Sequence, residues 1–185
     1  GKHLASNLED DNQILVTGRN LKRAEEACEG EKWKPVKQQE AAEKADVVII
    51  SVPISVTVDV IHEIGPHLSD NTILCDVTSV KKKPVEAMKN YSDEVLGMHP
   101  MYAPSNSIQG QKIVLCPEKG KKWTEMEEFW SRNGGDIHIT DPGSHDKAMS
   151  LVQGLMHFSE LVVAETIRKS DLGGADMSEY SSPVY

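Results

Sequence analysis

The stretch DVVIISV, residues 46–52, decides the fold. Its valines and isoleucines run without polar alternation, which is typical of a central parallel strand that helices cover on both faces. Pro53 follows directly, and because proline cannot donate to a sheet ladder, the strand must end there. We therefore expect a buried strand whose carboxyl end opens onto a loop at residues 51–55.

Similar short apolar runs flank this stretch. They are QILVTG (13–18), TILCDV (72–77), EVLGMH (94–99), KIVLC (112–116) and DIHIT (136–140). Segments with helical spacing or composition separate them, at residues 20–30, 38–45, 55–68, 81–90 and 121–135, and GKHLASNL (1–8) also has the pattern of a helix. This alternation predicts an α/β fold with a doubly wound, Rossmann-type parallel sheet.

The last part of the chain has a different pattern. From His145 to about Ser170, apolar residues recur with a period of 3.6 and predict one long helix. We therefore expect a dinucleotide-binding domain over residues 1–142 and the beginning of a helical substrate or dimerisation domain over 143–185. Neither end has a clear boundary signal, and we interpret the chain as a fragment of a longer enzyme.

Composition excludes several classes of function. The 185 residues carry a formal net charge of −9, which argues against nucleic acid as the main partner. Three cysteines, an odd number, indicate reduced thiols and a cytoplasmic location. No His/Cys spacing indicates a metal, and no apolar run approaches the ~20 residues of a membrane span.

The end of the first predicted strand, TGRN (17–20), lies where a dinucleotide-binding fold meets the adenosine ribose. An acidic residue there would bind the 2′-hydroxyl of NAD, and none is present. Gly18 and Arg19 instead leave room and positive charge for a 2′-phosphate, so the motif favours NADP over NAD. A plain turn with a surface arginine is the alternative interpretation.

Two more strand ends offer polar groups. In SVPIS (51–55), Ser55 is a candidate helix cap and Thr57 lies in the next helix's first turn, a suitable place for a nucleotide. In CDVTSVKKKP (75–84), Asp76 to Ser79 occupy the following strand end. The three lysines at 81–83 are typical of a solvated face, and Thr78 and Ser79 of simple caps.

GMHPMYAP (97–104) ends another strand, with His99 as its last residue. A lone histidine is more often structural than catalytic. The strand-end position favours chemistry, however, and Ser79 at the neighbouring strand end is placed to orient the ring. Because no nucleophile elbow is present, a general base is the better role for His99.

Together these segments resemble the prephenate dehydrogenase family of tyrosine biosynthesis. DVTSVK, GMHPMYAP and SHDKAMSLVQGLMHF follow one another with the family's spacing, SVPISVT is similar to its cofactor loop, and GKHLASNL to the helix after its glycine-rich loop. The resemblance covers essentially the whole chain. It implies that Gly1 is the last glycine of G-x-G-x-x-G and that the first strand lies upstream.

The resemblance implies oxidative decarboxylation of prephenate to 4-hydroxyphenylpyruvate, with NADP or NAD as hydride acceptor. His99 matches the family's catalytic base, which accepts the proton of the ring hydroxyl, and Ser79 the serine that holds it. The matching cofactor-lining positions are Gly1, Gly18, Arg19, Ser51, Val52, Pro53, Thr57, Asp76 and Thr78. The substrate positions are Ser79, His99, Tyr102, Gln153 and His157, and no metal is implied.

The resemblance has departures and leaves alternatives open. Tyr102 and Ala103 replace the usual Phe-Gly. Arg132 and Arg168 do not match the family's carboxylate-binding arginine, which we expect beyond Tyr185. A homodimer through the helical domain is implied. Arogenate as substrate, a β-hydroxyacid dehydrogenase (for which Lys147 and Lys169 are poorly placed) and a non-catalytic dinucleotide-binding module are the alternatives.

Overall fold

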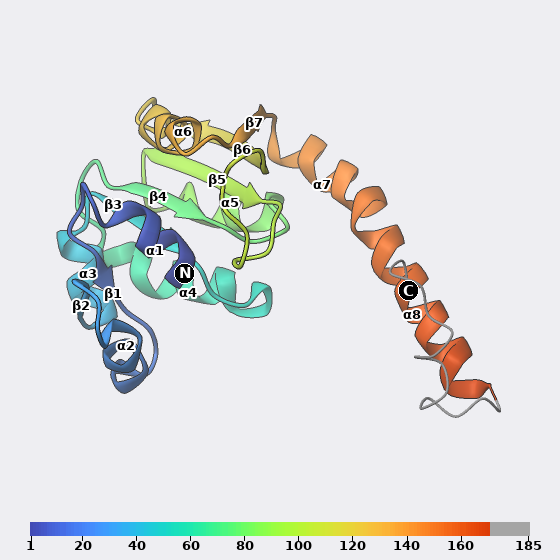
Figure 1. Cartoon of the computed structure of the whole chain (residues 1–185). Coiled ribbons are helices and arrows are strands. Elements are labelled where there is room, and N and C mark those ends of the chain that lie inside the picture. Colours follow the sequence, from blue (N-terminus) through green and yellow to red (C-terminus); the bar gives the residue numbers. More distant parts are fainter. Residues whose placement is uncertain (171–185) are drawn as a thin grey trace. The chain divides into compact units, whose positions relative to one another are not determined.

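The computed structural model describes residues 1–170, which divide into two units, Gly1–Asp146 and Lys147 onward. The first unit holds a two-stranded sheet, β1 (Leu15–Val16) and β2 (Lys34–Pro35), and a five-stranded sheet (Figure 1). The strands of the larger sheet, in spatial order, are β3 (Val47–Ile50), β4 (Ile73–Asp76), β5 (Glu94–Pro100), β6 (Lys112–Lys119) and β7 (Asp136–Ile139).

Helices connect most of these strands. They are α1 (Lys2–Leu8), α2 (Leu21–Cys28), α3 (Gln38–Lys44), α4 (Thr57–Ile64), α5 (Lys82–Met88) and α6 (Trp123–Arg132), with short 3-10 helices at Ile54–Val56 and Gly65–His67. Each predicted strand and helix of the first unit is therefore confirmed. Only β2, a two-residue strand, has no counterpart among the predicted elements.

The larger sheet buries both of its faces. Alternate residues of a strand point to opposite faces, so Ile73 and Cys75 of β4 enter one core and Leu74 enters the other. The first core contains side chains of α1 and α6, with Trp130 fully buried, and the second contains side chains of α3, α4 and α5. Helices thus cover both faces, as the expected Rossmann-type fold requires.

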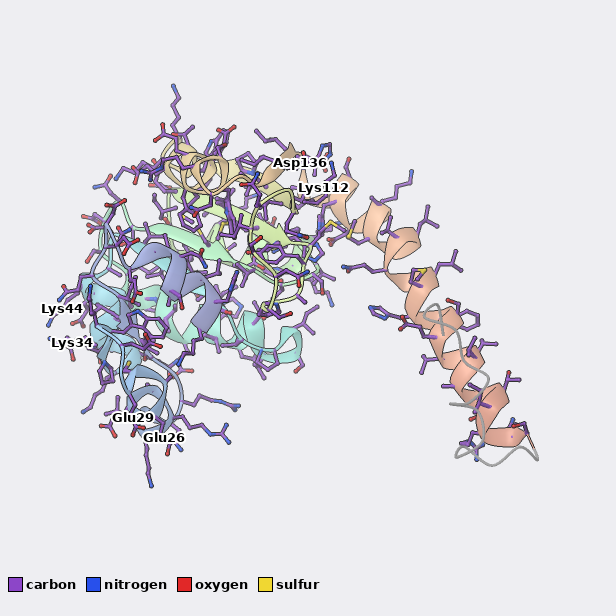
Figure 2. All side chains as sticks on the ribbon, in the orientation of Figure 1. Glu26, Glu29, Lys34, Lys44, Lys112 and Asp136 are labelled. Carbon is purple, nitrogen blue, oxygen red and sulfur yellow. The ribbon has the colours of Figure 1, made fainter. Side chains whose placement is uncertain are left out.

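Two details of the sheet differ from the prediction. β5 pairs antiparallel with β6, while the other neighbouring strands are parallel. The reason is that residues 101–111 contain no crossover helix, and a parallel return needs one. The first residues of β6 and β7, Lys112 and Asp136, are register partners and form an ion pair (Figure 2).

The second difference concerns β3. Among the described residues it pairs only with β4, so it is an edge strand and not the expected central one. Val47, Val48 and Ile49 are only half-buried, whereas every residue of β4 is buried. β1 is an edge strand of the smaller sheet and β3 an edge strand of the larger one. Each therefore has one side without a partner strand in the described chain.

The C-terminal segment forms two helices where one was expected, α7 (Pro142–Val152) and α8 (Gly154–Lys169). A turn at Gln153 separates them, directly before Gly154. The first domain was expected to end at residue 142, the first residue of α7, and the compact unit extends to Asp146. None of the helices in the described range is long and apolar enough to cross a membrane.

Candidate active site

Three parallel strands end side by side in the first unit. Ile50 of β3 is the register partner of Asp76 in β4, and Asp76 is the partner of Gly97 in β5. The residues that follow these positions therefore leave the sheet at the same edge, where ligands bind in open α/β folds. This brings the predicted segments 51–53, 76–79 and 97–99 together.

Asp76 lies fully buried at the centre of this edge. Its Oδ2 accepts hydrogen bonds from the Thr78 amide at 3.0 Å and the Thr78 hydroxyl at 2.5 Å, and it forms an ion pair with Lys81. Its Oδ1 is buried without a hydrogen-bond partner in the described structure. Burial raises the pKa of Asp76, and the charge of Lys81 and the bonds from Thr78 oppose this rise.

The run of three lysines predicted that Lys81 lies on a solvated face. This prediction is wrong for Lys81. The side chain is fully buried, and its Nζ also donates to the Met98 carbonyl at 2.8 Å. Burial lowers the pKa of Lys81, while the carboxylate of Asp76 raises it. Lys81 thus joins the end of β4 to the residue before His99, and the sequence pattern carried no signal for this.

Gly97 makes room for that buried lysine. A Cβ placed on Gly97 would lie 2.9 Å from Lys81 Cδ and 2.8 Å from Val85 Cγ2, both closer than carbon atoms pack. A side chain at this position would displace Lys81 from the groove over β5. The glycine is therefore required by space and not by backbone conformation.

His99 follows Met98 in β5 and is 5% exposed. Its Nδ1 lies 2.9 Å from Nε2 of His145, a buried residue of α7, and the two rings meet edge to face. Burial lowers the pKa of His99 to about 4, with further lowering from His145 and Lys81 and an opposing contribution from Asp146. The imidazole is therefore neutral at neutral pH, as a general base must be.

Asp146 completes a chain of hydrogen bonds behind this histidine. Its Oδ1 lies 2.8 Å from His145 Nδ1 and accepts from the Lys81 amide at 2.7 Å, while its Oδ2 accepts from the Lys82 amide at 3.0 Å. Partial burial alone would raise the pKa of Asp146. The hydrogen bonds from His145 and the two amides hold it below its ordinary value.

Ser79, the predicted partner of His99, has an exposed side chain next to buried Thr78. The partner that the structure gives to His99 Nδ1 is His145. Sequence reasoning missed the roles of His145 and Asp146, because SHD (144–146) was used only as part of a predicted helix and of a family signature. A histidine and an aspartate side by side at the start of a helix were the available signal.

The predicted cofactor loop lies beside the N-terminus of α1. Ser51 and Pro53 are exposed, Val52 is half-buried, and a Cβ on Gly1 would lie 3.5 Å from Ser51 Oγ. Thr57 is fully buried, and its hydroxyl donates to the Pro53 carbonyl at 3.2 Å. Thr57 therefore holds the loop from inside, and Gly1 and Ser51 form its open side.

The end of β1 is open to solvent. Gly18 and Arg19 are exposed, and no atom lies within 4 Å of a Cβ placed on Gly18. Asn20 then caps α2, since its side chain accepts from the Lys22 amide, and the first turn of that helix holds no acidic residue. An exposed, uncrowded glycine and an exposed arginine therefore stand together at the end of β1.

The remaining candidates fall in two places. Tyr102 is half-buried, and its hydroxyl lies 3.3 Å from Nε2 of His3 at the start of α1, with the two rings edge to face. Gln153 and His157 lie in the second unit, where the His157 amide donates to the Gln153 carbonyl at 2.9 Å. They are one helical turn apart, and His157 is exposed.

The residues present fit a dinucleotide. The open strand ends, the glycine beside Ser51 and the uncrowded Gly18–Arg19 corner are features that a nucleotide phosphate and ribose need. Within residues 1–170 no group of three or more His, Cys, Asp or Glu side chains could hold a metal ion.

Comparison with known proteins gives the family. The model of the prephenate dehydrogenase nucleotide-binding domain matches residues 5–139. The chain belongs to the prephenate dehydrogenase family. The resemblance on which the site residues were chosen is therefore confirmed, as is the nucleotide-binding domain with its Rossmann-type fold.

Relatives within this family are similar over most of the chain. A probable arogenate/prephenate dehydrogenase of Methanocaldococcus jannaschii is 33% identical over 93% of this chain and 41% of its own length. The T-protein of Haemophilus influenzae is 37% identical over 76% of this chain and 38% of its own. The chain thus spans about two fifths of the length of these relatives.

Solved structures of the family share the fold. Prephenate dehydrogenase from Aquifex aeolicus, in complex with hydroxyphenyl propionate and NAD+, has a TM-score of 0.80 at 20% identity, covering 99% of this chain and 75% of that one. Synechocystis arogenate dehydrogenase has a TM-score of 0.79 at 18% identity, covering the whole of this chain and 72% of that one. At these identities the likeness establishes the Rossmann-type architecture.

Proposed function

We propose that the full-length protein catalyses the NAD(P)-dependent oxidative decarboxylation of prephenate to 4-hydroxyphenylpyruvate, with His99 as the general base. The observation that supports this most directly is a neutral, buried histidine at the end of β5, in a chain of the prephenate dehydrogenase family. One relative is described as a probable arogenate/prephenate dehydrogenase, so arogenate is the second candidate substrate.

In this mechanism the ring hydroxyl of the substrate donates to His99. As the proton moves onto the imidazole, electron density rises at the carbinol carbon, whose hydride departs. When bound, the nicotinamide would supply the acceptor for that hydride. The carboxylate on the ring leaves as carbon dioxide, its bonding electrons make the ring aromatic, and His99 returns the proton to the phenol oxygen. His99 therefore ends the reaction in the same protonation state in which it began.

The cofactor positions follow from the same edge of the sheet. We propose that Gly1, Ser51, Val52 and Pro53 line the phosphates, that buried Thr57 holds their loop from inside, and that the strand end at Asp76 and Thr78 lies toward the nicotinamide. Gly18 and Arg19 face the adenosine ribose and favour NADP. The proposed substrate contacts are Ser79, His99, Tyr102, Gln153 and His157.

Two proposals concern segments around the site. We propose that a strand preceding Gly1 pairs with β1 and β3, each of which has an edge without a partner strand within residues 1–170. A second copy of the protein would cover α8, a helix without a single buried residue on which Leu155, Phe158 and Leu161 are among the exposed apolar side chains. We therefore propose a homodimer through the helical domain.

The deciding experiment follows the absorbance of reduced nicotinamide in full-length protein supplied with prephenate or arogenate and with NAD or NADP. We expect reduction with wild type and a loss of about 10²- to 10⁴-fold in kcat for His99→Asn, because a positioned general base contributes that much. Binding of NAD or NADP by the variant should be unchanged.

His67→Asn, at an exposed position of the 3-10 helix Gly65–His67, is the matched control and should keep wild-type turnover. Reduction by His99→Asn at the wild-type rate would contradict the role of His99. Cofactor binding without reduction of either substrate in wild type would contradict the proposed reaction.

A further inference from the structure

The proton-accepting nitrogen of His99 has to be chosen by something in the fold. A neutral imidazole carries its proton on one ring nitrogen and its lone pair on the other, and the partner of one nitrogen determines which. A base needs the lone pair on the nitrogen that meets the substrate. The partner of His99 Nδ1 is His145 Nε2, and if it accepts a hydrogen bond from Nδ1, the lone pair of His99 stays on Nε2.

That partner is set in turn by Asp146. The Asp146 carboxylate has only acceptor oxygens, and Oδ1 lies 2.8 Å from His145 Nδ1, so His145 must carry its proton on Nδ1. A neutral His145 then presents a lone pair on Nε2. Because this Nε2 lies 2.9 Å from His99 Nδ1, the bond forms only when His99 Nδ1 is protonated.

We propose that His145 and Asp146 are positioning residues, which hold His99 as the Nδ1–H tautomer so that its Nε2 carries the lone pair that accepts the substrate proton. The inference rests on the proposed function for the identity of the reaction, but the tautomer itself is a property of the protein without substrate. The arrangement places an aspartate and a histidine behind the base, in the way that an aspartate stands behind the histidine of a serine protease.

The geometry of Asp146 makes it a rigid anchor. Its two oxygens are held by the backbone amides of Lys81 and Lys82 at the start of α5, so the carboxylate cannot turn away from His145. Lys81 also reaches from the same point to the carbonyl of Met98, the residue before His99. Both ends of the hydrogen-bond chain are thereby tied to one short segment between β4 and α5.

The hydrogen bonds from His99 through His145 to Asp146 also stabilise the protonated form of His99. When His99 takes a proton on Nε2, its Nδ1–H still donates to His145, and the negative charge of Asp146 faces the new imidazolium across the His145 ring. The charged and titratable groups that face His99 are Lys81, His145 and Asp146, of which Asp146 alone raises its pKa. Removing the carboxylate must therefore move the protonation of His99 to lower pH.

The test uses full-length protein and two variants, Asp146→Ala and Asp146→Asn. The alanine variant removes the acceptor, and the asparagine variant keeps the shape of the side chain and removes its charge. Asp141→Ala is the matched control, because the Asp141 side chain likewise accepts a hydrogen bond from a backbone amide, that of Ser144 at 2.9 Å near the start of α7.

The first readout is the ring nitrogen spectrum of 15N-histidine-labelled protein without substrate, with His99 assigned through His99→Asn. We expect wild type and Asp141→Ala to show His99 with a proton on Nδ1 and a lone pair on Nε2. Asp146→Ala should show a mixture of the two tautomers. A wild-type His99 with its proton on Nε2 would overturn the proposal whether or not the enzyme reaction is identified.

The second readout is the pH profile of turnover. We expect kcat to fall about 10- to 100-fold in Asp146→Ala, less than for loss of the base itself because His99 remains. The acid limb should move to lower pH in both Asp146 variants and stay in place in Asp141→Ala. An active enzyme whose kcat and acid limb are unchanged in both variants would overturn the relay and leave the proposed reaction standing.

Discussion

His99 is held neutral by its surroundings, and the consequence extends beyond catalysis to stability. Burial, His145 and Lys81 lower its pKa to about 4, against ~6.5 for a histidine in an unfolded chain. Between these two pH values the unfolded chain binds a proton that the folded protein does not. The free energy of unfolding therefore rises with pH across this window.

We predict that acidification from about pH 6.5 to about pH 4 destabilises the protein through His99, and that this contribution stops changing below about pH 4. His99→Gln should flatten this part of the profile, since glutamine does not titrate. Urea unfolding at a series of pH values measures the slope. Exposed His67→Gln serves as the control and should keep the wild-type slope; equal slopes for wild type and His99→Gln would contradict the prediction.

Arg19 is the residue on which the proposed preference for NADP depends. Replacing it by aspartate removes a donor for the 2′-phosphate and adds an acceptor for the 2′-hydroxyl of NAD. We predict that Arg19→Asp lowers the ratio of kcat/KM for NADP to that for NAD by about 10- to 100-fold, since a hydrogen bond to a charged group contributes about 1.5–3 kcal/mol.

Lys121→Asp makes the same change of charge at an exposed position before α6 and should leave that ratio unaltered. A ratio that does not change in Arg19→Asp would remove Arg19 from the cofactor site.

At the scale of the elements, one buried ion pair joins the residue before α5 to the end of β4. Lys81 crosses above Gly97 to reach Asp76, so the two strands and the start of the helix share a single charged contact. Breaking such a pair from one side is costly, because the remaining charge stays buried without its partner. Asp76 would be especially affected, since its Oδ1 already lacks a hydrogen bond in the described structure.

We predict that Lys81→Met lowers the free energy of unfolding by about 3–5 kcal/mol, the range for loss of one member of a buried pair. Combining it with Asp76→Asn should restore part of that loss, because the uncompensated charge is gone. Chemical denaturation of the single and double variants measures both effects.

Lys83→Met provides the control within the same run of lysines, because Lys83 is exposed, and should change stability by less than about 0.5 kcal/mol. A similar loss in Lys81→Met and Lys83→Met would contradict the role assigned to the buried pair.

Elements were easier to predict from the sequence than contacts between them. Strands β3, β4 and β5 follow from apolar runs, and their order along the chain places their ends at one edge of the sheet. The burial of Lys81 could not be predicted in this way, because nothing in a run of three lysines shows which of them is buried. The bond between His99 and His145 joins segments far apart in the sequence and emerges only when α7 is folded.

The antiparallel pairing of β6 is an intermediate case. The absence of a helical pattern between residues 100 and 111 was present in the sequence, but the regular alternation elsewhere favoured a fully parallel sheet. The edge position of β3 was also missed. The sequence of an apolar strand does not show whether a neighbouring strand lies within the described residues.

At the scale of the whole molecule, the second unit cannot bury its apolar surface within the described residues. The exposed side chains of α8 include Phe158 at 64% and Leu161 at 69%, and no residue of this helix is buried. We predict that the full-length protein is a dimer and that Phe158→Glu combined with Leu161→Glu shifts it to monomer, because two charges cannot be buried in an apolar interface.

Light scattering coupled to gel filtration measures the mass of each form. Thr166→Glu, at an exposed polar position of the same helix, should remain dimeric. A monomeric wild type, or a doubly substituted protein that stays dimeric, would contradict the prediction.

The edge of β3 has a consequence for anyone who expresses this chain by itself. An apolar strand with open N–H and C=O groups is a template for another strand, and natural proteins cover or charge such edges to avoid aggregation. In residues 1–170, β3 offers such an edge, and β1 offers a second one. The 185-residue chain should therefore be prone to intermolecular β-pairing in the test tube, and a short upstream extension should improve its solubility more than any change to its surface.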